Sequence, residues 1–137
     1  VATTPMAVRE ALQRVRSALS RLGYGPSACG LAEVVLAEVM NNVVEHAYDG
    51  APDHWMLVEV RPQPGCVRMR VVDRGRAMPG GRPPAPPAQD LTVPVADLPE
   101  GGFGWLMIHE AVSNLTYTRE GDANCLSFVL PLGAGGP

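Results

Sequence analysis

One long segment of the chain cannot form regular secondary structure, and it limits what the rest can fold into. Glycine and proline account for 15 and 14 of the 137 residues, and eleven of them lie between Pro79 and Gly102. Proline does not enter the interior of a helix or a central strand, so the cluster Pro83–Pro87 excludes both there. A loop of this length is more often functional than idle. We therefore expect a single domain over residues 1–137 that carries this segment as an insertion.

Two stretches before the insertion show the periodicity of helices. Apolar residues recur at helical spacing over Pro5–Leu22, and glycines and a proline then stop the helix. A second, longer helix is expected over Ser27–Tyr48, with Ser27 as its N-cap. Turn residues follow it.

The period then changes to that of strands. Four stretches are expected to be strands: Met56–Val60, Cys66–Val72, Leu115–Arg119 and Asn124–Leu130. In the second stretch Arg68 and Arg70 alternate with apolar residues, so one face should be buried and the other exposed. A third helix is expected over Trp105–Val112. This order predicts an α+β fold, a two-layer sandwich whose mixed, mostly antiparallel sheet carries helices on one face.

Charge and cysteine content exclude several classes of protein. The formal net charge is −3, and no cluster of Lys or Arg provides a footprint for nucleic acid or an anionic membrane. The three cysteines lie far apart, which fits neither a disulfide framework nor a zinc site, so we expect a cytoplasmic location. No apolar run approaches the ~18–20 residues that span a bilayer. A start at Val1 without methionine is compatible with a piece of a longer protein.

A polar stripe on the second helix is the first candidate site. Glu38, Asn42 and His46 are spaced four residues apart, which places neighbouring side chains about 5–6 Å from one another on one face. Such a row can position a nucleophile, a divalent cation and a phosphate oxygen. An ordinary solvent-exposed face has the same pattern. However, asparagine is a poor helix former, and Leu31 and Val35 fall in the same arc.

A second candidate follows the second strand. Asp73 ends an apolar run and Gly75 comes two residues later. A carboxylate at the rim of a sheet can accept a hydrogen bond from an exocyclic amine, and a nearby glycine lets a flat ring approach the backbone. A simple turn after a strand has the same residues.

A third candidate precedes the last helix. Gly101, Gly102 and Gly104 open an apolar helix, whose free N–H groups and dipole can bind phosphate. The run is neither a Walker-type loop nor a dinucleotide-binding motif, and alone it is weak evidence.

Together the three signals resemble a known family. The run Glu38–Tyr48 resembles the N-box of the GHKL ATPase superfamily, and within it the bacterial anti-sigma-factor serine/threonine kinases. Asp73-Arg74-Gly75 is similar to their first glycine box, and Gly101–Ile108 to the second. The tail Leu115–Arg119, followed by Gly121, Asn124 and Leu126, is similar to their closing strands.

The resemblance implies a role for each residue around the phosphates of ATP. Glu38 would be the general base for the attacking hydroxyl, and Asn42 would hold Mg²⁺. His46 would lie further along the helix, near the nucleotide pocket. Gly102 and Gly104 would line the phosphates. Phosphoryl transfer needs positioning and charge neutralisation more than covalent catalysis, so such a set can suffice.

At the base end, the resemblance implies that Asp73 accepts from the adenine amino group and that Gly75 lets the ring approach. The segment 76–102 would be the lid over ATP. The implied partners are a sigma factor and a small antagonist protein that is phosphorylated on serine or threonine. A homodimer is also implied.

Two other hypotheses stay open. Ala77 stands where the first glycine box usually has a second glycine. This departure favours a non-catalytic module in which nucleotide sets the shape of a partner-binding surface. Alternatively, the chain is the ATPase domain of a larger bacterial signalling regulator.

Overall fold

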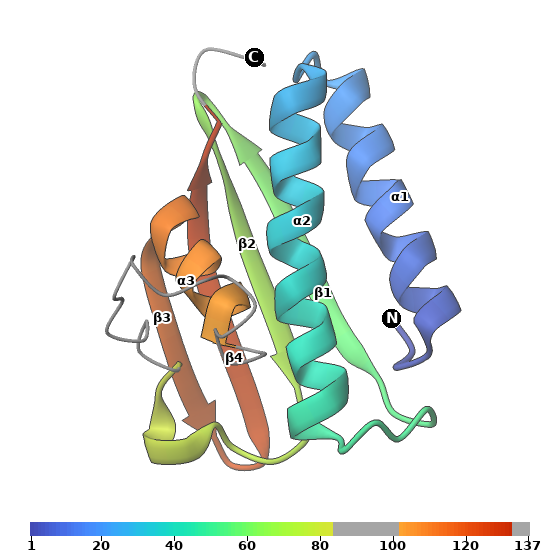
Figure 1. The fold of residues 1–137 in the computed structure, drawn as a ribbon, viewed down its shortest axis with the longest axis vertical. Coiled ribbons are helices and arrows are strands. Elements are labelled where there is room, and N and C mark those ends of the chain that lie inside the picture. Colours follow the sequence, from blue (N-terminus) through green and yellow to red (C-terminus); the bar gives the residue numbers. More distant parts are fainter. Residues whose placement is uncertain (84–101, 133–137) are drawn as a thin grey trace.

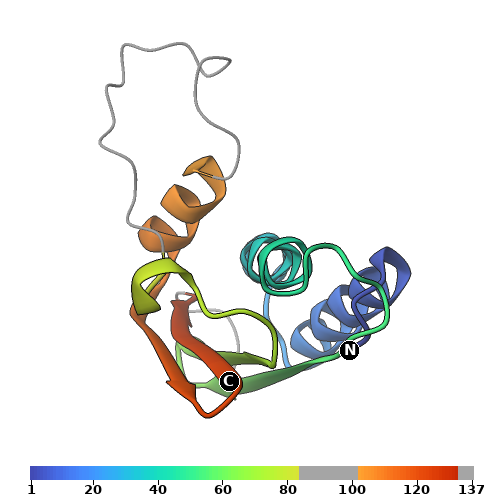
Figure 2. The ribbon, with the colours of Figure 1, turned by 90° about the horizontal axis from the view of Figure 1, so that it is seen from below.

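Four strands form one antiparallel sheet, and the helices lie on one of its faces (Figures 1 and 2). The structure is a computed structural model that describes residues 1–83 and 102–132. Its elements are α1 (Pro5–Arg21), α2 (Pro26–Asn42), β1 (Met56–Gln63), β2 (Cys66–Asp73), α3 (Gly102–Ala111), β3 (Ser113–Glu120) and β4 (Ala123–Pro131). The predicted α+β sandwich is confirmed, and every strand pairing in the described part is antiparallel.

The sheet has the order β1-β2-β4-β3, so β2 and β4 occupy its centre. The chain leaves β2, returns through α3 and β3, and only then places β4 beside β2. This arrangement pairs Asp73 at the end of β2 with Asn124 at the start of β4. The pair could not be read from local sequence patterns, because the two residues are 51 positions apart.

The predicted alternation along the strands places the core between sheet and helices. Fully buried residues come from α2, β2 and β4: Val35, Leu36, Val39, Met40, Val67, Met69, Val71, Phe128 and Leu130. The opposite face carries Arg68 and Arg70, as expected. There, a hydrogen bond from Arg70 holds the pKa of Glu59 below its usual range.

The two long helices begin differently from each other. The side chain of Thr4 caps α1 by accepting from the N–H of Ala7 at 3.1 Å. The predicted cap of the second helix, Ser27, is wrong. Instead Gly25 is the N-cap and Pro26 takes the first helical position, where its missing N–H costs nothing.

The second helix also ends differently from the prediction. After Asn42 it widens into a π-helical turn, Val43–Ala47. Taken together, Pro26–Ala47 is long and apolar enough to cross a membrane by length and composition alone, with a mean hydropathy of 1.3. The expectation that no stretch approaches that length is therefore wrong. The physical reason is that α2 supplies six buried residues, more than α1, and is correspondingly rich in alanine, valine and leucine.

The remaining expectations concern the insertion. A single 3₁₀ turn, Pro79–Gly81, follows the first glycine box. The rest of the predicted lid, with its proline cluster, lies outside the described residues. The third helix begins at Gly102, three residues earlier than predicted.

Candidate functional site

A cavity of about 850 Å³ lies between α2, its π-helical turn, α3 and one end of the central strands. Four residues of the predicted site line it: Glu38, Asn42, His46 and Asp73. Its apolar lining includes Val43, Met78, Trp105, Ile108 and Leu126. The fold thus brings together the stripe on the second helix and the carboxylate at the rim of the sheet. Gly75 and Gly104 do not line the cavity directly.

The polar stripe is continuous only in its first part. Glu38 is exposed and Asn42, one turn later, is half-buried. Beyond Val43 each π-helical turn holds more residues than an α-helical one, so His46 is displaced from the line of the other two. Its side chain is 69% exposed and lies 4.0 Å from Glu45.

Gly104 lies in the first turn of α3, directly against Glu38. A Cβ atom at Gly104 would overlap with the carboxylate of Glu38. The glycine therefore leaves room for this carboxylate at the positive end of a helix dipole. Gly102 is the first residue of the same helix.

Asp73 is the last residue of β2 and is only 7% exposed. Its Oδ1 atom accepts two hydrogen bonds, from the Gly75 N–H at 2.9 Å and from the Asn124 amide at 2.8 Å. Within residues 1–83 and 102–132, no hydrogen bond reaches Oδ2. This oxygen is therefore left for a ligand that donates a hydrogen bond.

Gly75 has a structural role that the sequence did not indicate. A Cβ atom there would overlap with the backbone carbonyl of Ala47. The next residue, Arg76, donates its N–H to the same carbonyl at 2.8 Å. The Arg76 guanidinium also donates to the His46 carbonyl and pairs with Asp49. The glycine thus lets the chain after β2 pack against the π-helical turn.

Asn124 was expected only as part of a closing strand, yet it is the centre of the polar network beside Asp73. It is 2% exposed and its Nδ2 donates to Asp73 Oδ1 and, at 3.1 Å, to the carbonyls of Gly75 and Arg76. One signal could have identified it. In the alternation of β4 it occupies an inward position in line with Leu126, where an apolar residue is normal.

Two further residues complete this network. Asn124 Oδ1 accepts from the Tyr117 hydroxyl at 2.7 Å and from the Arg119 guanidinium at 2.6 Å. The Tyr117 hydroxyl in turn accepts from the N–H of Met78 at 2.9 Å, and Arg119 donates to the carbonyl of Gly75 at 3.1 Å. The whole segment after β2 is therefore fixed to β3 and β4.

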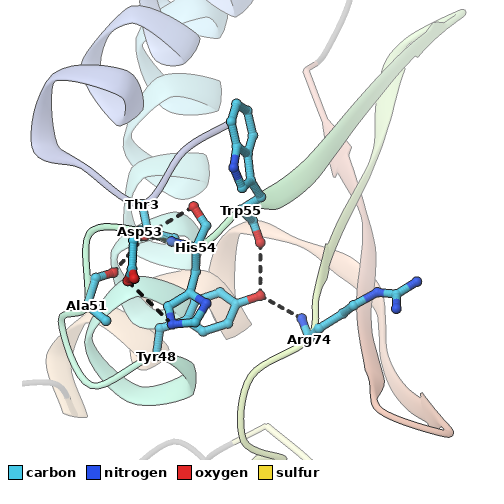
Figure 3. A network of polar contacts seen from close by, with 7 residues as sticks. All are labelled: Thr3, Tyr48, Ala51, Asp53, His54, Trp55 and Arg74. Carbon is cyan, nitrogen blue, oxygen red and sulfur yellow. Dashed lines mark hydrogen bonds and ion pairs between the residues drawn. The ribbon is translucent and has the colours of Figure 1, made fainter.

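A second network holds the same segment from the other side (Figure 3). The Tyr48 hydroxyl accepts from the N–H of Arg74 at 2.7 Å and donates to the carbonyl of Trp55 at 2.9 Å. The ring of Tyr48 stacks on that of His54 with centroids 4.5 Å apart. The residue next to Asp73 is thus tied to the loop that follows α2.

This loop is itself fixed to the start of the chain (Figure 3). The buried Thr3 hydroxyl donates to the Ala51 carbonyl at 2.7 Å and accepts from the His54 N–H at 3.2 Å. The His54 imidazole lies 3.6 Å from Asp53. Arg74 is therefore connected, through the loop after α2, to the first residues of the chain.

The charges around the cavity favour a cation. Among the described residues that line it, Glu38, Glu45 and Asp73 carry negative charge and Arg76 positive charge. Glu38 and Asn42 offer the oxygen ligands that Mg²⁺ prefers. In the described part, no three or more His, Cys, Asp or Glu side chains are grouped so that they could hold a metal ion by themselves. Two such ligands fit a magnesium ion that is bound mainly by phosphate and water.

Comparison with known proteins places these features in a family. A family model described as the histidine kinase-like ATPase domain matches residues 1–130. No curated protein sequence matches the chain.

Two solved structures are similar to this one. A structure of the RsbU and RsbW domains of Rv1364c from Mycobacterium tuberculosis has a TM-score of 0.62 and 20% identity over all of this chain and 32% of that one. The histidine kinase domain of a blue-light activated histidine kinase from Erythrobacter litoralis has a TM-score of 0.54 and 18% identity, over 91% and 61% of the two chains. This chain thus spans about a third of the Mycobacterium chain. At these identities the similarity concerns the fold.

The family match extends over the N-box helix, both glycine boxes and the closing strands, which are the segments that build the cavity. The chain therefore belongs to the histidine kinase-like ATPase domains, in the GHKL superfamily.

Proposed function

We propose that this protein is an ATP- and Mg²⁺-dependent serine/threonine protein kinase that phosphorylates a small antagonist protein and also acts as an anti-sigma factor. The observation that carries the proposal is the lining of one cavity by Asp73 at one end and by Glu38 and Asn42 at the other. A base-recognising acceptor and a pair of oxygen groups on a neighbouring helix are what a nucleoside triphosphate needs.

The base end of the cavity suits adenine. Asp73 Oδ2 accepts a hydrogen bond from the exocyclic amine, while Oδ1 stays bonded to the protein. Met78 and Leu126, which line the cavity close to the Asp73–Asn124 pair, supply apolar lining for the ring. Burial of a planar apolar ring against such side chains is favourable by about 25 cal/mol per Å².

The chemistry of transfer uses few protein groups. The Glu38 carboxylate takes the proton from the serine or threonine hydroxyl as that oxygen bonds to the γ-phosphorus. The bond from the γ-phosphorus to the β,γ-bridging oxygen breaks, and ADP leaves. Asn42 would hold Mg²⁺, and the bound ion would supply positive charge against the phosphates.

The proposed partners are a sigma factor and the antagonist that is phosphorylated. The resemblance of the N-box to anti-sigma kinases supports them, as does the similarity of fold to a chain with RsbU and RsbW domains. We propose a cytoplasmic location because these partners act there.

Calorimetric titration with ATP and Mg²⁺ tests the binding step. Asp73→Asn should raise the Kd for ATP by roughly tenfold to a hundredfold, because it weakens a charge-assisted hydrogen bond. Without a divalent cation the wild type should bind ATP much more weakly, since three carboxylates line the cavity. A wild type that does not bind ATP would overturn the proposal.

Labelled ATP and candidate antagonist proteins test the transfer step. Glu38→Gln should retain ATP binding and lower the transfer rate by roughly 10²- to 10⁴-fold, as expected for loss of a general base. Glu10→Gln makes the same change at an exposed position of α1 and should have no effect. If the wild type binds ATP without transferring phosphate to any antagonist, the non-catalytic module favoured by Ala77 is the better description.

A further inference from the structure

The amide of Asn124 has only one orientation that satisfies its neighbours. Arg119 can only donate hydrogen bonds, so Asn124 Oδ1 must face it. On the other side, Asp73 Oδ1 and two backbone carbonyls can only accept, so Nδ2 must face them. With five partners and 2% exposure, the side chain has no capacity left for a ligand.

This orientation of the Asn124 amide determines which oxygen of the Asp73 carboxylate is bonded to the protein. Both donors to the carboxylate, the Asn124 amide and the Gly75 N–H, bind Oδ1. A carboxylate held at one oxygen by two donors from different segments has its plane and rotamer defined. The position of its second oxygen is therefore set by the Asn124 amide and the Gly75 N–H.

Tyr117 connects the Asn124 amide to the chain that follows the first glycine box. Its hydroxyl donates to Asn124 and accepts from the N–H of Met78, near the start of the segment 76–102. Met78 also lines the cavity. The Tyr117 hydroxyl thus links Asn124, which bonds Asp73, to Met78, which is part of the apolar lining of the proposed base pocket.

We propose that Asn124 and Tyr117 are positioning residues for the nucleotide base, which select a base with an exocyclic amine by acting through Asp73 and Met78. The inference rests on the proposed nucleotide function of the cavity. Both residues line the cavity, and their polar groups form hydrogen bonds within the protein. A role only in folding would change stability, but would leave the preference between two nucleotides untouched.

Tyr117→Phe is the most direct test, because it removes one hydroxyl and keeps the ring. It leaves the Met78 N–H without its acceptor and removes one of the two donors to Asn124 Oδ1, so the Kd for ATP should rise about tenfold. The ratio of the Kd for GTP to the Kd for ATP should fall. Both Kd values are measured by calorimetry with Mg²⁺, after circular dichroism and thermal unfolding have verified that the variant is folded.

A matched control lies on the same strand. Thr116→Val also removes one hydroxyl from β3, but this hydroxyl bonds Ser127 on the face away from the helices. Both Kd values should remain those of the wild type. Asn124→Asp provides a second variant, since it places a carboxylate against three acceptors and should weaken ATP binding more than Tyr117→Phe does.

The outcomes separate the two proposals. Wild-type affinity and wild-type nucleotide preference in folded Tyr117→Phe would overturn the positioning role and leave the proposed function in place. If Asn124→Asp does not fold, the result for Tyr117→Phe decides. A wild type that binds neither ATP nor GTP would overturn the proposed function and this inference with it.

Discussion

At the scale of single residues, Gly75 shows how one missing methyl group shapes the site. Its resemblance to a glycine box implies that it lets the adenine ring approach. The structure provides a second reason, since a Cβ atom would meet the carbonyl of Ala47. The neighbouring Arg76 N–H donates to that same carbonyl. Replacement would therefore separate the chain after β2 from the π-helical turn even when no nucleotide is bound.

Gly75→Ala should lower the free energy of unfolding of the nucleotide-free protein by about 1–3 kcal/mol, the usual cost of overpacking. Urea unfolding followed by circular dichroism measures this change. Gly30→Ala is the control, because a Cβ atom at this position of α2 meets nothing within 4 Å. It should be neutral or stabilise the protein by up to about 1 kcal/mol through helix propensity. Equal stability of the two variants would contradict the structural role of Gly75.

At the scale of elements, the edge strand β1 has one side that is mostly unpaired. The N–H and carbonyl of Met56 form hydrogen bonds with Val1, away from β2. Because backbone groups alternate along a strand, the N–H groups of Val58 and Val60 also point away from β2. Among the described residues, no backbone hydrogen bond to them is present.

Hydrogen exchange should therefore alternate along β1. The amides of Val58 and Val60 should exchange quickly, and those of Leu57 and Glu59, which face β2, should be protected. Residue-resolved exchange measured by NMR tests this pattern. Uniform protection along the strand would mean that another segment or molecule pairs with this edge.

The π-helical turn Val43–Ala47 is the second element that shapes the candidate site. It interrupts the stripe after Asn42, so Glu38 and Asn42 keep the expected one-turn spacing, whereas His46 is displaced. Its end is defined by a hydrogen bond from the Tyr48 N–H to the Val43 carbonyl at 3.2 Å. Such turns are frequent at functional sites. Here the turn provides the carbonyl against which the first glycine box packs.

At the scale of the whole molecule, the layers explain why α2 buries more residues than α1. It lies beside α1 over the same face of the sheet (Figure 2). Leu36 is fully buried in the core formed between them, whereas Val34, two positions earlier, is 49% exposed. The candidate stripe of α2 is therefore carried by a helix with six buried residues, against two for α1.

Leu36→Ala should lower the free energy of unfolding by about 2–5 kcal/mol, because it leaves a cavity in the core. Val34→Ala should change it by less than about 0.5 kcal/mol. Urea unfolding of both variants without nucleotide provides the comparison. A small effect of Leu36→Ala would contradict the placement of this helix face in the core.

Local patterns in the sequence were enough to predict the helices and the four strands, and to mark as candidates Glu38, Asn42, His46 and Asp73, which line the cavity. Periodicity of 3.6 or 2 residues follows from burial of one face, so it is present in the sequence itself. The tertiary structure alone decided the strand order that pairs Asp73 with Asn124, the packing of Gly75 on Ala47 and the π-helical turn. These features depend on contacts between residues far apart in the chain. A buried asparagine with five partners differs from an exposed one only by what the fold places around it.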